Sequence, residues 1–179
     1  MNRRTQLTLA ALAVATSLIG CSTTDHSKAP ALQRNASWVV LPFENHTETP
    51  MAGNRAEAIA SAVLHAKGIG SVQRYTASSD TSDMLFGSAS AKGSDAAMSW
   101  AKEKGANYIL TGTVDEWRYK VGVDGEPAVG VSLRIIDASN GTTLWSGAGG
   151  KSGWSREALS SVAQKLIRNL LDSGLSASR

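Results

Sequence analysis

Apolar side chains repeat along the chain with the two periods that distinguish strands from helices. Residues 38–43, Trp-Val-Val-Leu-Pro-Phe, form a nearly continuous apolar run of strand length, which is typical of a strand buried on both faces. Short apolar runs and apolar residues at every second position predict further strands at 72–75, 108–121, 129–135 and 143–145. Apolar residues at helical spacing predict helices at 50–67, 94–104 and 155–171.

These elements follow one another in the order β-α-β-α-β-β-β-α. The order predicts a single, three-layer-like α/β domain over residues 37–175, in which a mixed β-sheet is flanked by amphipathic helices. Asp124 and Asn140 are each followed by glycine, a hairpin signal, so the last three strands are expected to form an antiparallel meander. Ser94 and Ser155 are the expected N-caps of the second and third helices.

The first 20 residues have the layout of a secretory signal peptide. Met1 to Arg4 carry positive charge, and the apolar stretch 7–19 that follows is shorter than the about 20 residues that a membrane span needs. Leu18-Ile19-Gly20-Cys21 resembles the bacterial lipobox, in which the cysteine receives lipid and becomes the first residue of the mature chain. We therefore expect a lipoprotein signal peptide at 1–20 and a lipidated Cys21. The alternative is an ordinary signal peptide followed by an unmodified cysteine.

Cys21 is the only cysteine of the chain, so an internal disulfide and a thiolate zinc site are excluded. The next residue is Ser22 rather than aspartate, which in the enterobacterial-type sorting rule favours the outer membrane. We expect 21–36 to be a flexible tether, since 22–36 is polar, contains proline and shows no period. A second segment, 76–93, has the composition of a long loop. The expected location is the outer membrane, with the lipid-anchored domain facing the periplasm.

Charge excludes one class of partner. The signal peptide contains Arg3 and Arg4, so its removal leaves 16 of the 18 basic side chains against 15 acidic ones, a net charge of about +1. A nucleic-acid-binding protein would carry a clustered basic face instead. No nucleic-acid partner is therefore expected.

The glycine-rich stretch 145–152, Trp-Ser-Gly-Ala-Gly-Gly-Lys-Ser, superficially resembles a phosphate-binding loop. The Walker A spacing requires a glycine where Trp145 stands, and the dinucleotide-binding spacing requires one at Ser152. We interpret the stretch as a connector between a strand and a helix, in which glycines let the backbone approach a partner or a membrane.

The ionisable residues do not form a catalytic pattern. The three histidines, His26, His46 and His65, lack metal-ligand spacing, and no nucleophile elbow accompanies them. Asp115 and Glu116 are adjacent in a predicted strand, where neighbours point to opposite faces, so they are a poor acid/base pair. We therefore expect that the protein is not an enzyme and that it binds neither a metal ion nor a cofactor. A pocket that gathers His46 and a carboxylate would reopen the question.

Two stretches carry a resemblance to a known family. The first strand and its flank read WVVLPFENHTETP, and the segment DGEPAVGVSLRIIDASNGTTLWS is followed by GWSRE. Residues 37–172 with these motifs resemble the PelC family of outer-membrane lipoproteins, which belong to Pel exopolysaccharide export systems. The V-L-P-F-x-N motif is also shared with CsgG and LpoB lipoproteins, whereas the later motifs point to PelC.

The resemblance implies a homo-oligomer, a dodecameric ring of lipid-anchored subunits under the outer membrane. It implies an acidic periplasmic side, an opposite side that faces lipid, and a partner barrel, PelB, to which the ring passes a cationic exopolysaccharide. The alternative is an LpoB-like outer-membrane lipoprotein that regulates a cell-wall synthase. Proteins of that type usually need a long tether, and here the expected tether of about 15 residues spans at most about 50 Å.

Four further residues are candidates for the two sides of such a ring. Trp154 matches an aromatic residue that faces the membrane in PelC-like proteins, and Lys151 beside it suits lipid phosphates. The alternative for Trp154 is a hydrophobic staple before the last helix, packed on Leu159. Asp124 and Glu126 lie in the expected hairpin after residue 121, where we expect them to line the periplasmic mouth and attract the polysaccharide. The alternative for them is an ordinary solvated turn.

Overall fold

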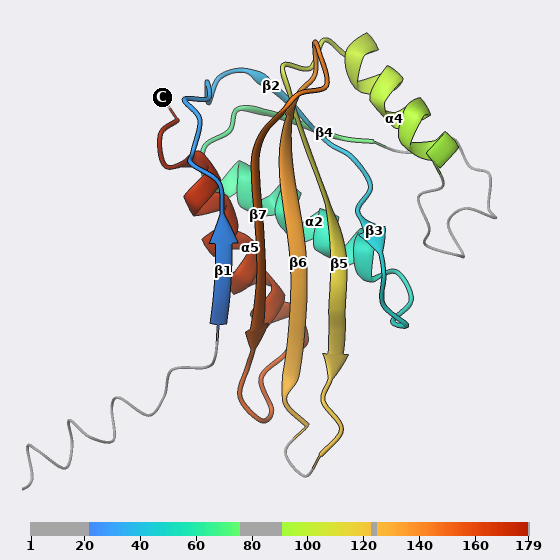
Figure 1. Cartoon of the computed structure of the whole chain (residues 1–179), viewed down its shortest axis with the longest axis vertical. Helices are drawn as coiled ribbons and strands as arrows, with labels where there is room; N and C mark the ends of the chain where they lie inside the picture. Colours follow the sequence, from blue (N-terminus) through green and yellow to red (C-terminus); the bar gives the residue numbers. More distant parts are fainter. Residues whose placement is uncertain (1–21, 76–90, 123–124, 179) are drawn as a thin grey trace, which may run out of the picture.

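The computed structural model describes residues 22–75, 91–122 and 125–178. Among these residues, one mixed sheet of seven strands packs against three helices (Figure 1), which confirms the predicted α/β fold. The strands are β1 (Ser22–His26), β2 (Ser37–Val40), β3 (Glu44–Asn45), β4 (Ser71–Arg74), β5 (Tyr108–Tyr119), β6 (Pro127–Asp137) and β7 (Thr143–Ser152). The helices are α2 (Ala52–Ala66), α4 (Ala91–Glu103) and α5 (Leu159–Leu175).

The strands lie in the order β1-β7-β6-β5-β2-β4, and β3 also pairs with β5. β2 runs parallel to both β4 and β5, as expected where helices connect the strands. β5 pairs antiparallel with β6, β6 with β7, and β7 with β1, so the predicted meander is confirmed. Two strands, β1 and β3, were not predicted.

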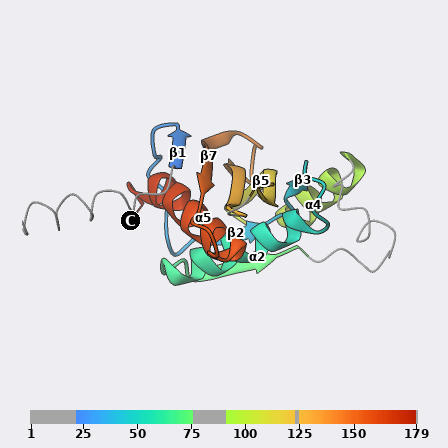
Figure 2. The same ribbon diagram turned by 90° about the horizontal axis from the view of Figure 1, so that it is seen from below.

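Two helices cover one face of the sheet. Figure 2 shows α2 and α5 together on that side, and their apolar faces pack on Trp38, Leu110 and Leu133. The opposite face is covered by a helix at one end only. There α4 packs on Val39 and Ile109, which explains why β2 is apolar on both faces.

Two predicted N-caps do not lie at the observed starts of their helices. α4 already begins at Ala91, so Ser94 lies inside the helix rather than at its cap. The expected loop 76–93 therefore ends in a helical turn, and its residues 76–90 lie outside the described residues. α5 begins at Leu159 after the N-cap Ala158, so Ser155 is not its cap. The reason is the left-handed backbone of Arg156, with φ 72°, which a helix cannot contain.

The segment expected to be a tether begins as part of the sheet. β1 lies antiparallel to β7, with Ser22 opposite Lys151 and His26 opposite Gly147. Further along, Leu32 is buried in the main core. The expectation of a flexible tether over 22–36 is therefore wrong, because main-chain hydrogen bonds fix a segment whose side chains carry no apolar period.

The glycine-rich stretch is a strand rather than a connector. It forms the second half of β7, which continues to Ser152. A Cβ atom at Gly147 would lie 2.6 Å from the buried ring of Trp145, and one at Gly149 would lie 2.9 Å from the carbonyl oxygen of Thr23. These glycines thus let a large aromatic ring and β1 approach the strand closely.

One buried carboxylate predicts a pH dependence of folding stability. Glu57 of α2 is 3% exposed and accepts a hydrogen bond of 2.9 Å from Arg74 Nε. Burial raises the pKa of Glu57 above its usual value, and Arg74 offsets only part of this effect. The folded state therefore holds this proton more tightly, so its stabilising contribution is present in acid and is lost as pH rises through the raised pKa.

Replacing Glu57→Gln should remove this dependence. We expect the stability of the parent chain, relative to that of the variant, to increase as the pH is lowered from 7 toward 4.5, the ordinary pKa of the group. Chemical denaturation of both proteins across this range measures the difference. A constant difference, or one of opposite sign, would contradict the assignment.

Candidate membrane-facing end of the sheet

Three separate segments meet at one end of the sheet. Ala128 at the start of β6 pairs with Ser152 at the end of β7, so the β5–β6 hairpin lies beside the turn that leads into α5. Ser22, the first residue of β1, pairs with Lys151 at the same level. Figure 1 shows all three segments at its lower end, with α4 at the opposite end. We call this the hairpin end.

The turn after β7 is held in place by several hydrogen bonds. The Gly153 N–H donates to Pro127 O at 2.8 Å, and the Trp154 N–H donates to Glu157 Oε2 at 3.2 Å. Lys165 Nζ donates to Glu157 Oε1 at 2.6 Å. This hydrogen bond and that from Trp154 lower the pKa of Glu157, with Lys165 the larger cause. A Cβ at Gly153 would lie 2.5 Å from Cγ2 of the buried Val162 and 2.9 Å from Cγ of Pro127, so the turn favours glycine there.

This turn presents Trp154 to solvent. Its side chain is 48% exposed although tryptophan is usually well buried. The staple alternative requires Trp154 directly before the N-cap, but the N-cap is Ala158 and the residue before it is Glu157. Trp154 therefore has no staple position in this structure.

Two exposed apolar residues join Trp154 at the hairpin end. Tyr119, the last residue of β5, is 52% exposed, and its hydroxyl accepts a hydrogen bond of 3.2 Å from the Leu159 N–H. Val121, two residues further on, is fully exposed. The sequence contained a signal for both, because the apolar alternation from Trp117 continues through them, but their exposure could not be read from it.

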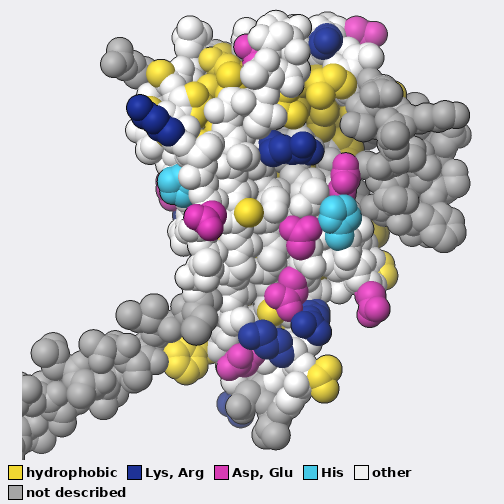
Figure 3. Space-filling view, viewed as in Figure 1, with side chains coloured by type: hydrophobic (Ala, Val, Ile, Leu, Met, Phe, Trp, Pro, Cys, Tyr) yellow, Lys and Arg dark blue, Asp and Glu magenta, His cyan; other side chains and the backbone are white. Residues whose placement is uncertain are grey.

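Charged groups surround these apolar side chains. Lys120 Nζ contacts Ser152 Oγ at 2.7 Å and Glu126 Oε2 at 3.9 Å, and the Lys120 N–H donates to Glu126 O at 2.7 Å. Lys151 is partly buried and Arg156 is exposed. At this end Figure 3 shows hydrophobic and basic side chains close to acidic ones. Aromatic and basic side chains together are typical of a membrane interface.

The predicted acidic hairpin lies at the same end as the predicted membrane contact. Asp124 is outside the described residues, whereas Glu126 is half exposed beside Lys120. Since the hairpin and Trp154 adjoin, they cannot occupy opposite sides of a ring. If Trp154 contacts the membrane, the hairpin therefore lies on the membrane side of the ring and not on its periplasmic side.

The predicted lipidation residue, Cys21, also lies outside the described residues. In the sequence it directly precedes Ser22, the first residue of β1. No helix in the described part of the chain combines the length and the apolar character needed to cross a membrane.

His46 does gather carboxylates, but not in a catalytic order. Its Nδ1 lies 3.1 Å from Asp115 Oδ1 and its Nε2 lies 3.4 Å from Glu44 Oε2, with the imidazole half exposed. Ser132 Oγ donates to Asp115 Oδ2 at 3.3 Å. In a catalytic triad the histidine lies between hydroxyl and carboxylate. Here the carboxylate lies between them, so the cluster cannot activate the serine.

A β-bulge corrects the expected geometry of the adjacent carboxylates. The register of β5 against β6 shifts between Val114 and Glu116, so Asp115 is the extra residue. Asp115 and Glu116 therefore face the same side of the sheet rather than opposite sides. Glu116 forms an ion pair of 2.9 Å with Arg118 while Asp115 contacts His46, so the two are held by different partners.

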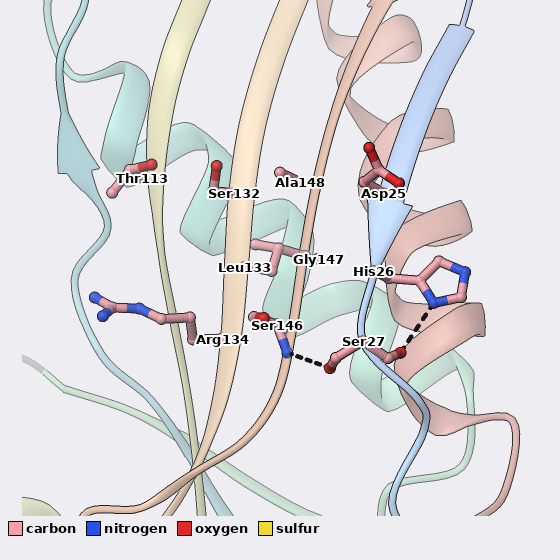
Figure 4. Close-up of a pocket in the computed structure, with 10 residues that line it drawn as sticks. All are labelled: Asp25, His26, Ser27, Thr113, Ser132, Leu133, Arg134, Ser146, Gly147 and Ala148. Atoms are coloured by element: carbon pink, nitrogen blue, oxygen red, sulfur yellow. Dashed lines mark hydrogen bonds between the residues drawn. The ribbon is translucent and has the colours of Figure 1, made fainter.

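The sheet face without α2 and α5 is polar and composed of small residues. Figure 3 shows this face, where charged side chains are scattered over a surface of backbone and uncharged polar side chains. A shallow hollow of about 440 Å³ crosses it between β1 and β5 (Figure 4). Ser132, Ser146 and Ala148 form its floor, Arg134 extends to one side, and the His26 ring points away. The hollow thus pairs no nucleophile with a base.

Comparison with solved structures identifies the family. The PelC dodecamer from Paraburkholderia phytofirmans is 42% identical to this chain, with a TM-score of 0.74. The match covers 89% of this chain and 99% of the PelC chain. The chain belongs to the PelC family. A PelC variant dodecamer from the same organism matches at 41% identity and TM-score 0.71, over 89% of this chain and all of the other.

More distant matches carry the fold alone. Lipoprotein GNA1162 from Neisseria meningitidis is 21% identical, with a TM-score of 0.53 over 76% of this chain and 96% of its own. No family model matches the chain, and no curated protein matches it. The assignment to PelC therefore rests on the solved structures, and the predicted resemblance is confirmed.

Proposed function

We propose that this chain is a lipid-anchored outer-membrane component of a Pel-type exopolysaccharide export complex. Its copies form a homo-oligomeric ring that guides a cationic polysaccharide to an outer-membrane barrel, PelB. The observation that carries the proposal is the 42% identity to a PelC dodecamer over nearly the full length of that chain. Its role is structural rather than enzymatic.

The anchor is the lipidated Cys21, and the hairpin end meets the membrane. Tryptophan and lysine suit the bilayer interface, so Trp154 and Lys151 contact the headgroup region of the outer membrane. The domain then lies in the periplasm below them. The short distance from Cys21 to the sheet supports this arrangement. It disfavours an LpoB-like regulator, which would have to reach a synthase across the periplasm.

The acidic side chains act through repetition around the ring. Twelve copies, as in the PelC dodecamers, place Asp124 and Glu126 around one opening as about two dozen carboxylates. A ring of like charge focuses a field that attracts cations. Because the hairpin adjoins Trp154, we assign these carboxylates to the rim of the opening on the membrane side.

Charge reversal at the hairpin tests the proposal. Asp124→Lys should preserve folding and ring size but lower polysaccharide export in a strain that lacks its own copy of the gene. Asp124 is preferred because Glu126 lies 3.9 Å from the Lys120 ammonium, which neutralises part of its charge. Binding of a cationic oligosaccharide to the purified ring should weaken as salt rises, since the Debye length is only about 8 Å at physiological ionic strength.

Glu103→Lys is the matched control, because Glu103 is exposed at the end of α4, away from the hairpin. This variant changes the net charge equally and should export normally. Native mass spectrometry gives the ring size of each variant. Normal export by the Asp124→Lys ring would contradict the role of the hairpin, and a monomeric parent protein would contradict the ring itself.

A further inference from the structure

β1 has an unusual basis for its place in the sheet. All five of its side chains, Ser-Thr-Thr-Asp-His, are exposed, so it contributes no apolar core residue. It nevertheless pairs with β7 along its whole length. We infer that β1 is a mounting strand, which holds the lipid-bearing residue at the hairpin end so that Tyr119, Val121 and Trp154 enter the phospholipid interface together.

β1 and the residue after it contact β7 mainly through the backbone. The Ser27 N–H donates to Ser146 O at 2.9 Å, and the Ser146 N–H donates to Ser27 Oγ at 3.1 Å. At the other end of the strand, Gly149 leaves room for the Thr23 carbonyl oxygen and the Thr24 methyl group, each 2.9 Å from where a Cβ would lie. β7 therefore carries glycine where β1 lies closest to it.

This pairing fixes where the lipid leaves the fold. The inference rests on the proposed lipidation of Cys21. Since Ser22 lies opposite Lys151, the acyl chains start within one residue of the end of β7. A flexible tether would let the domain take any orientation below the membrane. A strand in register allows only the orientation that turns the hairpin end toward the lipid.

The hairpin end suits a phospholipid surface. Three of the four large apolar side chains exposed in the described residues, Tyr119, Val121 and Trp154, lie there. The fourth, Met51, precedes α2 and lies elsewhere. Exposed Arg156 and the ammonium group of Lys120 can reach lipid phosphates beside them. The chain itself continues from this end to the acylated residue, which selects a bilayer rather than a protein as the occupant.

In an antiparallel ladder the N–H groups of alternate residues face the neighbouring strand, and this allows a matched pair of proline variants. The Ser27 N–H faces β7, so the Asp25 N–H faces β7 as well, whereas the Thr24 N–H points away from it. Asp25→Pro removes a hydrogen bond of the ladder, and Thr24→Pro leaves the ladder intact. Asp25→Ala controls for the lost carboxylate. A flexible Gly-Ser linker inserted between Ser22 and Thr23 detaches Ser22 and the lipid from the ladder and leaves the pairs from Thr23 to His26 in place.

The test uses the lipidated mature protein in vesicles of phosphatidylethanolamine and phosphatidylglycerol. Cys21 is the only cysteine and its thiol is blocked by lipid, so Val121→Cys provides one attachment point for an environment-sensitive dye. The emission of the dye should shift to the blue, and iodide should not quench it. The same dye at Glu103→Cys, on the opposite end, should remain in water.

Asp25→Pro and the linker should each abolish the blue shift while fatty-acid labelling and vesicle binding persist. Thr24→Pro and Asp25→Ala should retain the shift. A labelled parent chain whose dye stays in water would overturn the mounting role alone, as would a shift that survives both the proline and the linker. A parent chain without fatty-acid label would overturn the proposed anchor, and the mounting role with it.

Discussion

Replacing Cys21→Ser is expected to release the protein from the outer membrane. Acyl chains contribute about 0.8 kcal/mol per buried CH₂, so one long chain contributes roughly 10 kcal/mol. The exposed parts of Tyr119, Val121 and Trp154 provide far less apolar area than long acyl chains do. In the proposed arrangement they orient a subunit that is already anchored and cannot retain one that is not. The variant should therefore be found as a soluble or unprocessed chain, and export should cease.

Fractionation of the cell envelope and labelling with fatty acid measure this effect. Ser22→Ala is the matched control, because it changes the neighbouring residue and keeps the thiol. It should still be labelled and still fractionate with the outer membrane. A serine variant that carries label and remains in that membrane would exclude the lipobox interpretation.

Replacing Gly53→Ala is expected to cause a large loss of stability for the addition of a single methyl group. Gly53 lies in the first turn of α2, where an added Cβ would be 2.2 Å from the carbonyl oxygen of Phe43. That oxygen belongs to the backbone between β2 and β3, so α2 must move away from the sheet. Overpacking of this kind costs about 3 kcal/mol, while the higher helix propensity of alanine returns about 1 kcal/mol.

The net loss of about 2 kcal/mol should lower the Tm by roughly 4–8 °C for a domain of this size. Gly70→Ala is the control, because no atom lies within 4 Å of its added Cβ and its φ is not positive. It should leave the Tm nearly unchanged. Thermal unfolding followed by circular dichroism compares the two, and equal melting temperatures would show that the helix accommodates the methyl group.

The elements that the sequence predicted are those stabilised by apolar side chains. Leu166 and Leu170 repeat at helical spacing, and Val129 and Val131 alternate, because each packs on the core. β1 leaves no such trace, since its place depends on main-chain hydrogen bonds to a strand far along the chain. The half of β7 that pairs with β1 was marked in the sequence only by glycines, and the structure explains them because β1 lies against them.

The sequence marked the candidate site only by the chemistry of single residues. Trp154 beside Lys151 suggested a membrane interface, which stays a prediction, and the structure adds that Trp154 is exposed. Tyr119 and Val121 were not recognised as part of the same surface, because apolar residues that alternate along a strand are usually buried. Only the structure shows that these two side chains are exposed. The Asp115–Glu116 geometry was misjudged for a different reason: a bulge adds one residue to β5, and no local signal marks it.

The proposed lipid anchor on β1 has a consequence for how copies of the chain meet. Subunits that stand in one orientation on a bilayer diffuse in two dimensions with their axes already parallel. Much of the rotational entropy that association normally removes is then lost at anchoring, before any neighbour is touched. Confinement to a layer also raises the effective concentration of each copy for the next. Ring closure on the membrane therefore requires weaker contacts between subunits than closure of the same ring in solution.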